Sequence, residues 1–146
     1  MKLVRAAVAA LAATAILIAG ATGPALAAYP TTDYPNLTNW TGSADVTVTW
    51  YNRSVGATGA VADHTADDVY TLLCVSAWTG PNATGDSSGR HCRAAENLSR
   101  GFNFTVDYLY DPAPGGYQSV VVELGYQYYA YGYVTFEETR TRNRPA

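Results

Sequence analysis

The sequence predicts a mostly β fold of the α+β class: an antiparallel sheet of about five strands with one short helix packed on one face. Two segments, 44–51 and 102–110, alternate apolar and polar residues with the period of a half-buried strand. Two further segments, 69–75 and 117–124, carry apolar runs bounded by loop residues, as strands at the centre of a sheet do. Only 92–98 has helical character.

The first expected strand, 44–51, places Val46, Val48 and Trp50 on one face and threonines on the other. This pattern indicates one face packed on a core and one face in contact with water. The segment 53–68 follows, and its two Gly and many other small residues favour a loop.

A second loop is expected at 79–89, which contains a Gly-Pro pair and two more Gly. The stretch 92–98 then forms about two helical turns, which Gly101 terminates. Residues 133–136 form the last strand, and the Arg-rich tail from Arg140 is expected to fray. The alternative architecture for the same strands is an all-β sandwich.

The N-terminus has the organisation of a secretory signal peptide. Lys2 and Arg5 precede an apolar run at 6–20, and Ala-Leu-Ala at 25–27 matches a small-x-small cleavage site. We therefore expect residues 1–28 to be removed. The mature protein is then secreted, extracellular and free of the membrane.

The rest of the chain divides into an extended N-terminal arm at 29–43, a single secreted domain at 44–140 and a flexible tail at 141–146. Residues 29–146 contain seven Arg, no Lys and twelve Asp or Glu, which gives a net charge of −5. Nucleic-acid binding is disfavoured, because neutralising phosphates requires clustered Lys and Arg.

The sequence has two cysteines, Cys74 and Cys92. In an exported chain the simplest expectation is one disulfide between them. A closed loop of this length would stabilise the fold by about 3 kcal/mol through the entropy of the unfolded chain.

One segment suggests catalysis. Residues 85–89, Gly-Asp-Ser-Ser-Gly, approach the nucleophile motif of chymotrypsin-like proteases, and His64 lies upstream beside Asp63. The mature chain is too short for the two barrels that hold such a triad, and the usual sequence around the histidine is missing. We therefore expect a polar loop at this position and no enzymatic activity.

His64 and His91, together with Asp63, Asp67 or Asp68, are candidate metal ligands by residue type. Their spacing matches no helical or zinc-finger pattern. Surface histidines are the simpler interpretation, so neither a metal nor another cofactor is expected.

The order of segments resembles that of the subtilisin inhibitor-like family of secreted serine protease inhibitors. The likeness rests on a Val-Thr-Val-Thr strand at 46–49, Thr-Leu-Leu-Cys at 71–74, Cys-Arg-Ala-Ala at 92–95, Val-Val-Val at 120–122 and Thr-Phe at 135–136. It covers most of residues 44–140. The second disulfide of the family, which fixes the reactive loop, has no counterpart among these residues.

The resemblance implies a secreted inhibitor of subtilisin-like serine proteases, which inserts an exposed loop into the protease cleft as a substrate would. Two alignments place the scissile bond at Gly115-Gly116 or at Tyr108-Leu109. A homodimer is also implied. The candidate contact loop is Tyr108, Leu109, Tyr110, Asp111, Pro112, Ala113, Pro114, Gly115, Gly116 and Tyr117.

The alternative function is an extracellular carbohydrate- or protein-binding β-sandwich module with no inhibitory activity. Its support is the density of aromatic residues, since tyrosine and tryptophan combine an apolar ring with a polar group and are enriched at binding surfaces. The candidate platform is Trp40, Trp50, Trp78, Tyr126, Tyr128, Tyr129, Tyr131 and Tyr133.

Overall fold

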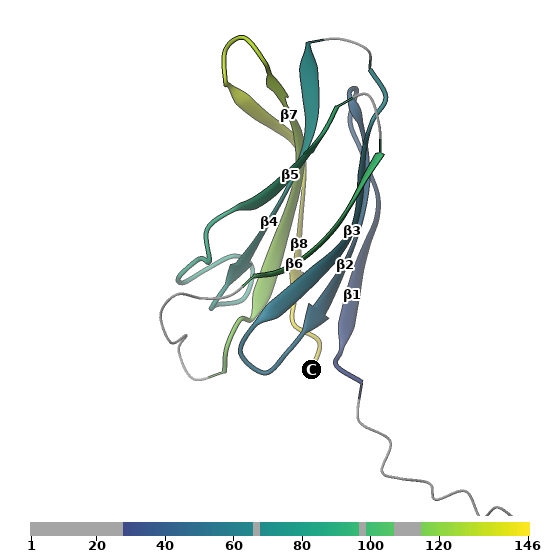
Figure 1. The fold of residues 1–146 in the computed structure, drawn as a ribbon. Helices are drawn as coiled ribbons and strands as arrows, with labels where there is room; N and C mark the ends of the chain where they lie inside the picture. Colours follow the sequence, from purple (N-terminus) through teal and green to yellow (C-terminus); the bar gives the residue numbers. More distant parts are fainter. Residues whose placement is uncertain (1–27, 66–67, 97–98, 107–114) are drawn as a thin grey trace, which may run out of the picture.

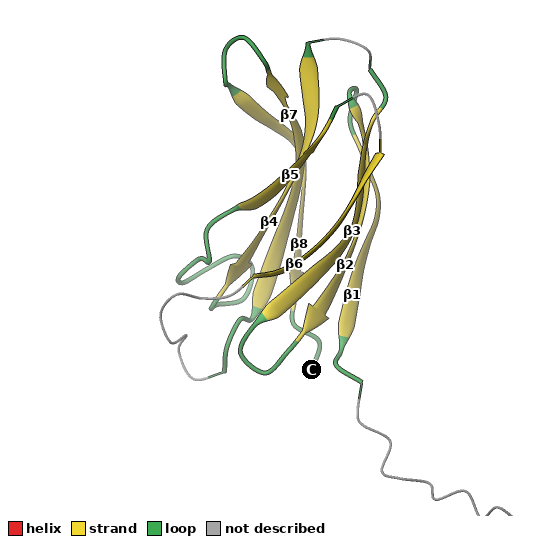
Figure 2. Cartoon of the chain, viewed as in Figure 1, coloured by secondary structure: helices red, strands yellow, loops and turns green. Residues whose placement is uncertain are grey.

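The computed structural model describes residues 28–146 apart from 66–67, 97–98 and 107–114. Every regular element of this part of the chain is a β-strand, and none is a helix (Figure 2). Within the described residues the strands are β1 (Thr31–Thr38), β2 (Gly42–Trp50), β3 (Val55–Asp63), β4 (Val69–Trp78), β5 (His91–Ala95), β6 (Ser99–Val106), β7 (Ser119–Tyr128) and β8 (Val134–Asn143).

The strands form two antiparallel sheets that lie face to face (Figure 1). The order is β1-β2-β3-β6 in the first sheet and β5-β4-β7-β8 in the second sheet. The chain therefore passes between the sheets after β3, after β5 and after β6. This arrangement is an all-β sandwich, the alternative that the sequence offered, and it replaces the expected single sheet of about five strands.

The core lies between the sheets and follows the alternation of the strands. Val46, Val48 and Trp50 of β2 are at most 3% exposed, and Leu73 and Val75 of β4 belong to the same cluster from the other sheet. Fully burying a side chain of this size contributes about 1.5–3 kcal/mol. The strand expected at 44–51 is thus confirmed, with the apolar face directed as the pattern indicated.

Buried hydrogen bonds also join the sheets. The Tyr34 hydroxyl donates to the carbonyl of Val120 at 3.2 Å. Burial raises the pKa of Tyr34, and the nearby Arg142 charge lowers it by less, so the hydroxyl keeps the proton that it donates. At the other end of the sandwich Thr71 Oγ1 donates to Thr41 Oγ1 at 2.9 Å.

The helix expected at 92–98 is wrong in the described residues, because His91–Ala95 is the edge strand β5. Cys92 pairs with Cys74 of β4, and the two are joined by the expected disulfide. The helix preference of two alanines and a glutamate amounts to a few tenths of a kcal/mol per residue. Hydrogen bonding to β4 and the covalent link outweigh it.

The loop expected at 53–68 is also wrong for most of its length, because Val55–Asp63 is β3, an inner strand of the first sheet. Close packing limits the size of the side chain at one of its small residues, Gly56. A Cβ atom added at Gly56 would lie 3.0 Å from the Tyr51 ring, so a larger side chain would displace that ring. Low strand preference in the sequence here reflects close contact rather than a turn.

Both ends of the described chain take part in the sheets. The segment expected as an extended arm contains β1, which pairs with β2 from Thr31 to Thr38. The last strand runs to Asn143, into the segment expected as a flexible tail. These two edge strands are joined by side chains: Arg140 Nη2 donates to the carbonyl of Asn36 at 3.0 Å, and Glu138 accepts from the Thr38 amide at 2.6 Å.

Removing the disulfide is expected to destabilise the sandwich. The Cys74→Ala/Cys92→Ala variant should lose about 3 kcal/mol of unfolding free energy, because the unfolded chain gains the entropy of an open loop. Urea unfolding followed by tryptophan fluorescence measures the loss. Reduced wild-type protein is the control that keeps the side-chain volume, and equal midpoints for reduced and oxidised protein would contradict the expectation.

Candidate functional site

The outer face of the second sheet, turned away from the first sheet, carries a surface depression. Alternation along the strands directs Ser76 and Trp78 of β4, Glu123 of β7 and two threonines of β8, Thr139 and Thr141, to this face. Together with the loop that follows β4 they line an open cavity of about 670 Å³. We call this cavity the sheet groove.

The loop 79–89 forms one wall of the sheet groove and is fixed to the end of β4. The Ser88 amide donates to the carbonyl of Ala77 at 2.9 Å, and the Thr79 amide donates to the carbonyl of Asp86 at 3.0 Å. Trp78 also forms a bridge with Ser87. The sequence correctly predicted a loop, and these hydrogen bonds hold it in one conformation against the sheet.

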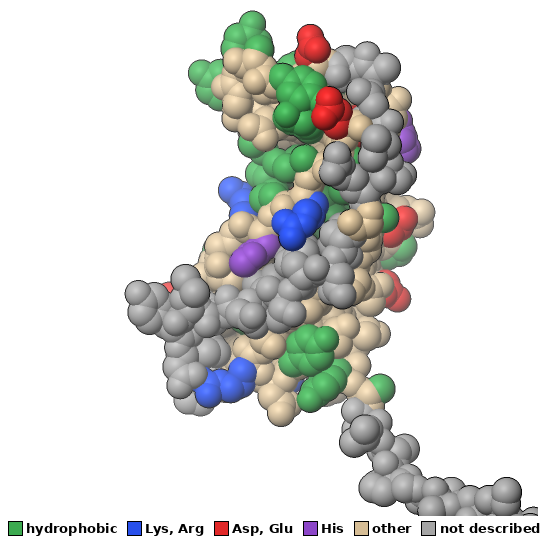
Figure 3. Space-filling model, in the orientation of Figure 1, with side chains coloured by type: hydrophobic (Ala, Val, Ile, Leu, Met, Phe, Trp, Pro, Cys, Tyr) green, Lys and Arg blue, Asp and Glu red, His purple; other side chains and the backbone are tan. Residues whose placement is uncertain are grey.

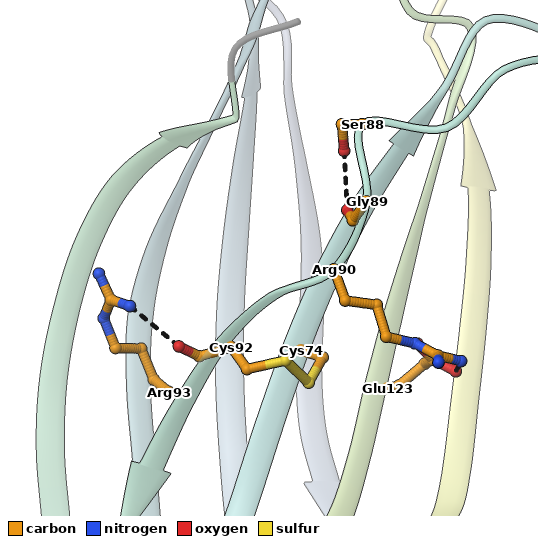
Figure 4. The surroundings of a disulfide bond; sticks show 7 residues. All are labelled: Cys74, Ser88, Gly89, Arg90, Cys92, Arg93 and Glu123. Carbon is orange, nitrogen blue, oxygen red and sulfur yellow. Dashed lines mark hydrogen bonds and ion pairs between the residues drawn. A yellow bond between two sulfur atoms is a disulfide. The ribbon is translucent and has the colours of Figure 1, made fainter. Parts of the chain in front are cut away.

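Charge in the sheet groove is concentrated in one pair. Arg90 donates through Nε to Glu123 at 2.6 Å and through Nη2 to the same carboxylate at 2.8 Å (Figure 4). Glu123 is 8% exposed, and its hydrogen bond raises the pKa of the Arg90 guanidinium above its usual value. The two charges cancel, so the floor of the groove is polar but has no net charge from this pair.

The disulfide positions Arg90. Cys92 of β5 is bonded to Cys74 of β4. Arg90 is the residue just before β5, and its side chain extends toward Glu123 (Figure 4). The guanidinium also lies 4.7 Å from the centre of the Phe136 ring. Covalent, ionic and cation–π contacts therefore converge on one short segment.

Phe136 reaches this face because of an irregularity in β8. The pairing shifts between Leu124 and Gly125 of β7, which leaves one extra residue in β8. On the C-terminal side of the shift, Glu138 points toward β1. On the N-terminal side, Phe136 points to the outer face of the sheet, toward Arg90. A Cβ atom at Gly125 would stand 2.1 Å from the Thr135 carbonyl oxygen, so the irregularity requires glycine there.

Aromatic residues gather at the opposite end of the sandwich, where β7 turns into β8. Hydrophobic side chains stand exposed there (Figure 3), and Tyr131 and Tyr133 are 72% and 75% exposed. The Tyr126 ring lies 5.1 Å from the ring of Trp40 and 5.6 Å from that of Tyr128. Tyr126 pairs with the inward-facing Thr71, so the cluster of Trp40, Tyr126 and Tyr128 lies on the inner side of the second sheet.

A second aromatic pair at that end lies on the outer side. The rings of Tyr70 and Tyr129 are 3.9 Å apart. Partial burial, followed by a hydrogen bond to Glu96, raises the pKa of the Tyr129 hydroxyl. The structure thus divides the platform expected from the sequence: Trp50 is buried in the core, and the other members belong to separate surfaces.

The candidate protease-contact loop lies largely outside the described residues. Nothing is described for Tyr108, Leu109, Tyr110, Asp111, Pro112, Ala113 and Pro114. Of the rest, Gly115 is exposed, Gly116 is buried and Tyr117 is 1% exposed. Tyr117 follows the loop as part of the core rather than as part of an exposed surface.

The residues considered for catalysis are far apart. His64 follows β3 at one end of the sandwich and makes a 3.3 Å contact with Ser43, whereas Ser87 bridges Trp78 at the other end of β4. Among the described residues no group of three or more His, Cys, Asp or Glu is placed to hold a metal ion.

Comparisons with known proteins leave this arrangement without a named relative. No family model matches the sequence, and neither the curated proteins nor the solved structures include a significant match. Within the ranges that the structure describes, no helix has the length and apolar character needed to cross a membrane.

The Arg90–Glu123 pair is expected to stabilise the sheet groove. Arg90→Met should lower the unfolding free energy by about 1–2 kcal/mol, because the buried Glu123 carboxylate loses two hydrogen-bond donors, whereas removing a guanidinium that is already half-exposed costs little by itself. Arg90→Met/Glu123→Gln should recover part of the loss.

Urea unfolding of the single and double variants measures the coupling between the two residues. Arg142→Met, a change at an exposed arginine of β8, is the matched control and should stay within about 0.5 kcal/mol of wild type. Additive losses in the double variant would show that the pair makes no net contribution.

Proposed function

We propose that this protein is an extracellular binding module that takes an uncharged, hydroxyl-rich ligand, a glycan, in the sheet groove. The observation that carries the proposal is the composition of that groove. Trp78 supplies an aromatic ring, Ser76, Thr139 and Thr141 supply hydroxyls, and the one close charge pair is internally neutralised. Few ligand classes match all three properties.

A sugar ring presents an apolar face of C–H groups and an edge of hydroxyls. An indole ring can pack against the apolar face, and serine, threonine and carboxylate oxygens can exchange hydrogen bonds with the hydroxyls. Pockets that orient small ligands commonly combine aromatic packing with a few fixed polar groups. Trp78 is already oriented, because its indole N–H donates to Ser76 Oγ at 3.2 Å.

The Arg90–Glu123 pair argues against a charged ligand. An anionic ligand would compete with Glu123 for the guanidinium, and a cationic ligand would compete with Arg90 for the carboxylate. Either would leave one member of a partly buried pair without its partner, which costs free energy. A neutral sugar can accept or donate at the outer edges of the pair without separating it.

The extracellular location belongs to the proposal. It rests on the signal peptide expected at 1–28, and a Cys74–Cys92 disulfide is consistent with an oxidising compartment. An exported module of this kind meets extracellular polysaccharides, and those without acidic groups are neutral and rich in hydroxyls.

Trp78→Ala is expected to weaken glycan binding by about 30-fold, the equivalent of a central aromatic hot spot of about 2 kcal/mol. The measurement is retardation of the mature protein in native gels that contain xylan, hydroxyethylcellulose, glycol chitin, mannan or laminarin. Trp40→Ala is the matched control, since Trp40 is half-exposed on another surface, and should migrate like wild type.

A second variant tests the groove without removing its aromatic ring. Thr139→Val/Thr141→Val replaces two exposed hydroxyls of β8 by methyl groups of similar size, so folding should be unaffected. Retardation should fall in the same gel that retards wild type. Lack of retardation of wild type by every polysaccharide in the panel would overturn the proposal.

Inhibition of subtilisin-like proteases is the competing proposal, and its support remains the sequence resemblance. It requires the segment 108–117 to present a substrate-like loop and implies a homodimer. The mature protein is added to subtilisin in excess and the residual activity is measured. Stoichiometric inhibition, reduced by Tyr108→Ala or Gly115→Ala, would favour the inhibitor over the glycan-binding module.

A further inference from the structure

We infer that the glycan is a polymer chain that lies extended along the outer face of the second sheet, from Trp78 at one end of β4 to the Tyr70–Tyr129 pair at the other. This inference rests on the proposed function, since it concerns the length and direction of the ligand in the same site. Three features of the outer face lead to it.

The first feature is the direction of the β4 side chains. Thr71, Leu73 and Val75 face the first sheet, so the residues between them face outward. Tyr70 and Trp78 are both of this outward set. Strand β4 therefore carries an outward-facing aromatic residue near each of its two ends.

The second feature is the spacing of the two aromatic residues. Eight residue steps separate Tyr70 from Trp78, and at a rise of about 3.3 Å per residue they stand about 26 Å apart. A single sugar or a disaccharide on Trp78 cannot reach the tyrosines. A chain of several sugar rings can contact both ends at once.

The third feature is the surface between the ends. Leu72 and Cys74 of β4 face outward and are nevertheless buried, and on the same face the Arg90 guanidinium lies 4.7 Å from the centre of the Phe136 ring. The charge of Arg90 is held by Glu123. The surface between the groove and the tyrosine pair therefore carries no net charge from the Arg90–Glu123 pair, which suits a neutral chain.

The tyrosine pair is shaped to act as a fixed aromatic contact. The Tyr129 amide donates to the carbonyl of Asp68 at 3.1 Å, which ties the end of β7 to the start of β4. Its ring packs on Tyr70, with the two ring centroids 3.9 Å apart. Aromatic side chains that are already ordered lose little conformational entropy when a ligand packs on them.

The experiment compares affinities along a series of oligosaccharides, from disaccharide to hexasaccharide, prepared from the polysaccharide that retards the wild-type protein. Isothermal titration calorimetry on the mature protein gives each Kd. We expect the hexasaccharide to bind at least about tenfold more tightly than the disaccharide, because only the longer chain reaches the tyrosine pair.

Tyr129→Ala should remove this gain with chain length and leave the disaccharide affinity unchanged, and Tyr70→Ala should do the same. Tyr128→Ala is the matched control. Tyr128 and Tyr129 are adjacent and 39% and 37% exposed, but the Tyr128 ring contacts Tyr126 on the inner side of the sheet. It should bind the hexasaccharide like wild type.

The outcomes separate this inference from the proposed function. Equal affinity for the disaccharide and the hexasaccharide, or an equal effect of Tyr128→Ala and Tyr129→Ala, would overturn the extended path and leave glycan binding in the groove intact. If Trp78→Ala binds no glycan and the wild-type affinity rises with chain length, both the glycan-binding function and the extended path are supported. Absence of binding to every oligosaccharide and polysaccharide overturns both.

Discussion

The burial of β4 on both of its faces is the constraint on which the rest of the sandwich depends. All ten of its residues pair with β7, and five of them also pair with β5. Leu73 and Val75 fill the core on one side, while Cys74 and Ser76 are buried on the other. A shift of the strand by one residue would exchange these two faces, so its register is strongly specified. The register of β4 with β5 and β7 thus determines where the groove floor, the disulfide and the outer tyrosine pair lie.

The chemistry of the groove comes from how neighbouring strands complete this central strand. On one side the disulfide fixes β5 and so aims Arg90 across β4 at Glu123. On the other side the irregular pairing at Gly125 turns Phe136 toward the same guanidinium. The result is a polar surface whose principal charges are already satisfied. A surface of this kind discriminates by shape, hydroxyl contacts and aromatic packing more than by charge.

The aromatic residues show how much a sheet separates what is adjacent in sequence. Tyr128 and Tyr129 are neighbours, yet the first contacts Tyr126 on the inner side and the second contacts Tyr70 on the outer side. A Tyr-rich segment is therefore not one platform but contributes to two surfaces. Trp50, also aromatic, serves only the core, where its indole N–H donates to Thr32 at 2.9 Å.

The sequence by itself determined the strands at 44–51 and 69–75, the loop at 79–89 and the Cys74–Cys92 bond, because local alternation, turn residues and a cysteine count are properties of neighbouring residues. It could not determine that the segment at 53–68 contains an inner strand, because small residues such as Gly56 favour a loop locally, whereas in the fold a Cβ atom there would lie 3.0 Å from the Tyr51 ring. Local preference likewise favoured a helix where β5 lies, and pairing with β4 overrode it. Nor could the sequence assemble the groove, whose residues come from three strands and a loop. Only the tertiary structure brings them together, since the face to which each side chain points depends on the register of strands distant along the chain.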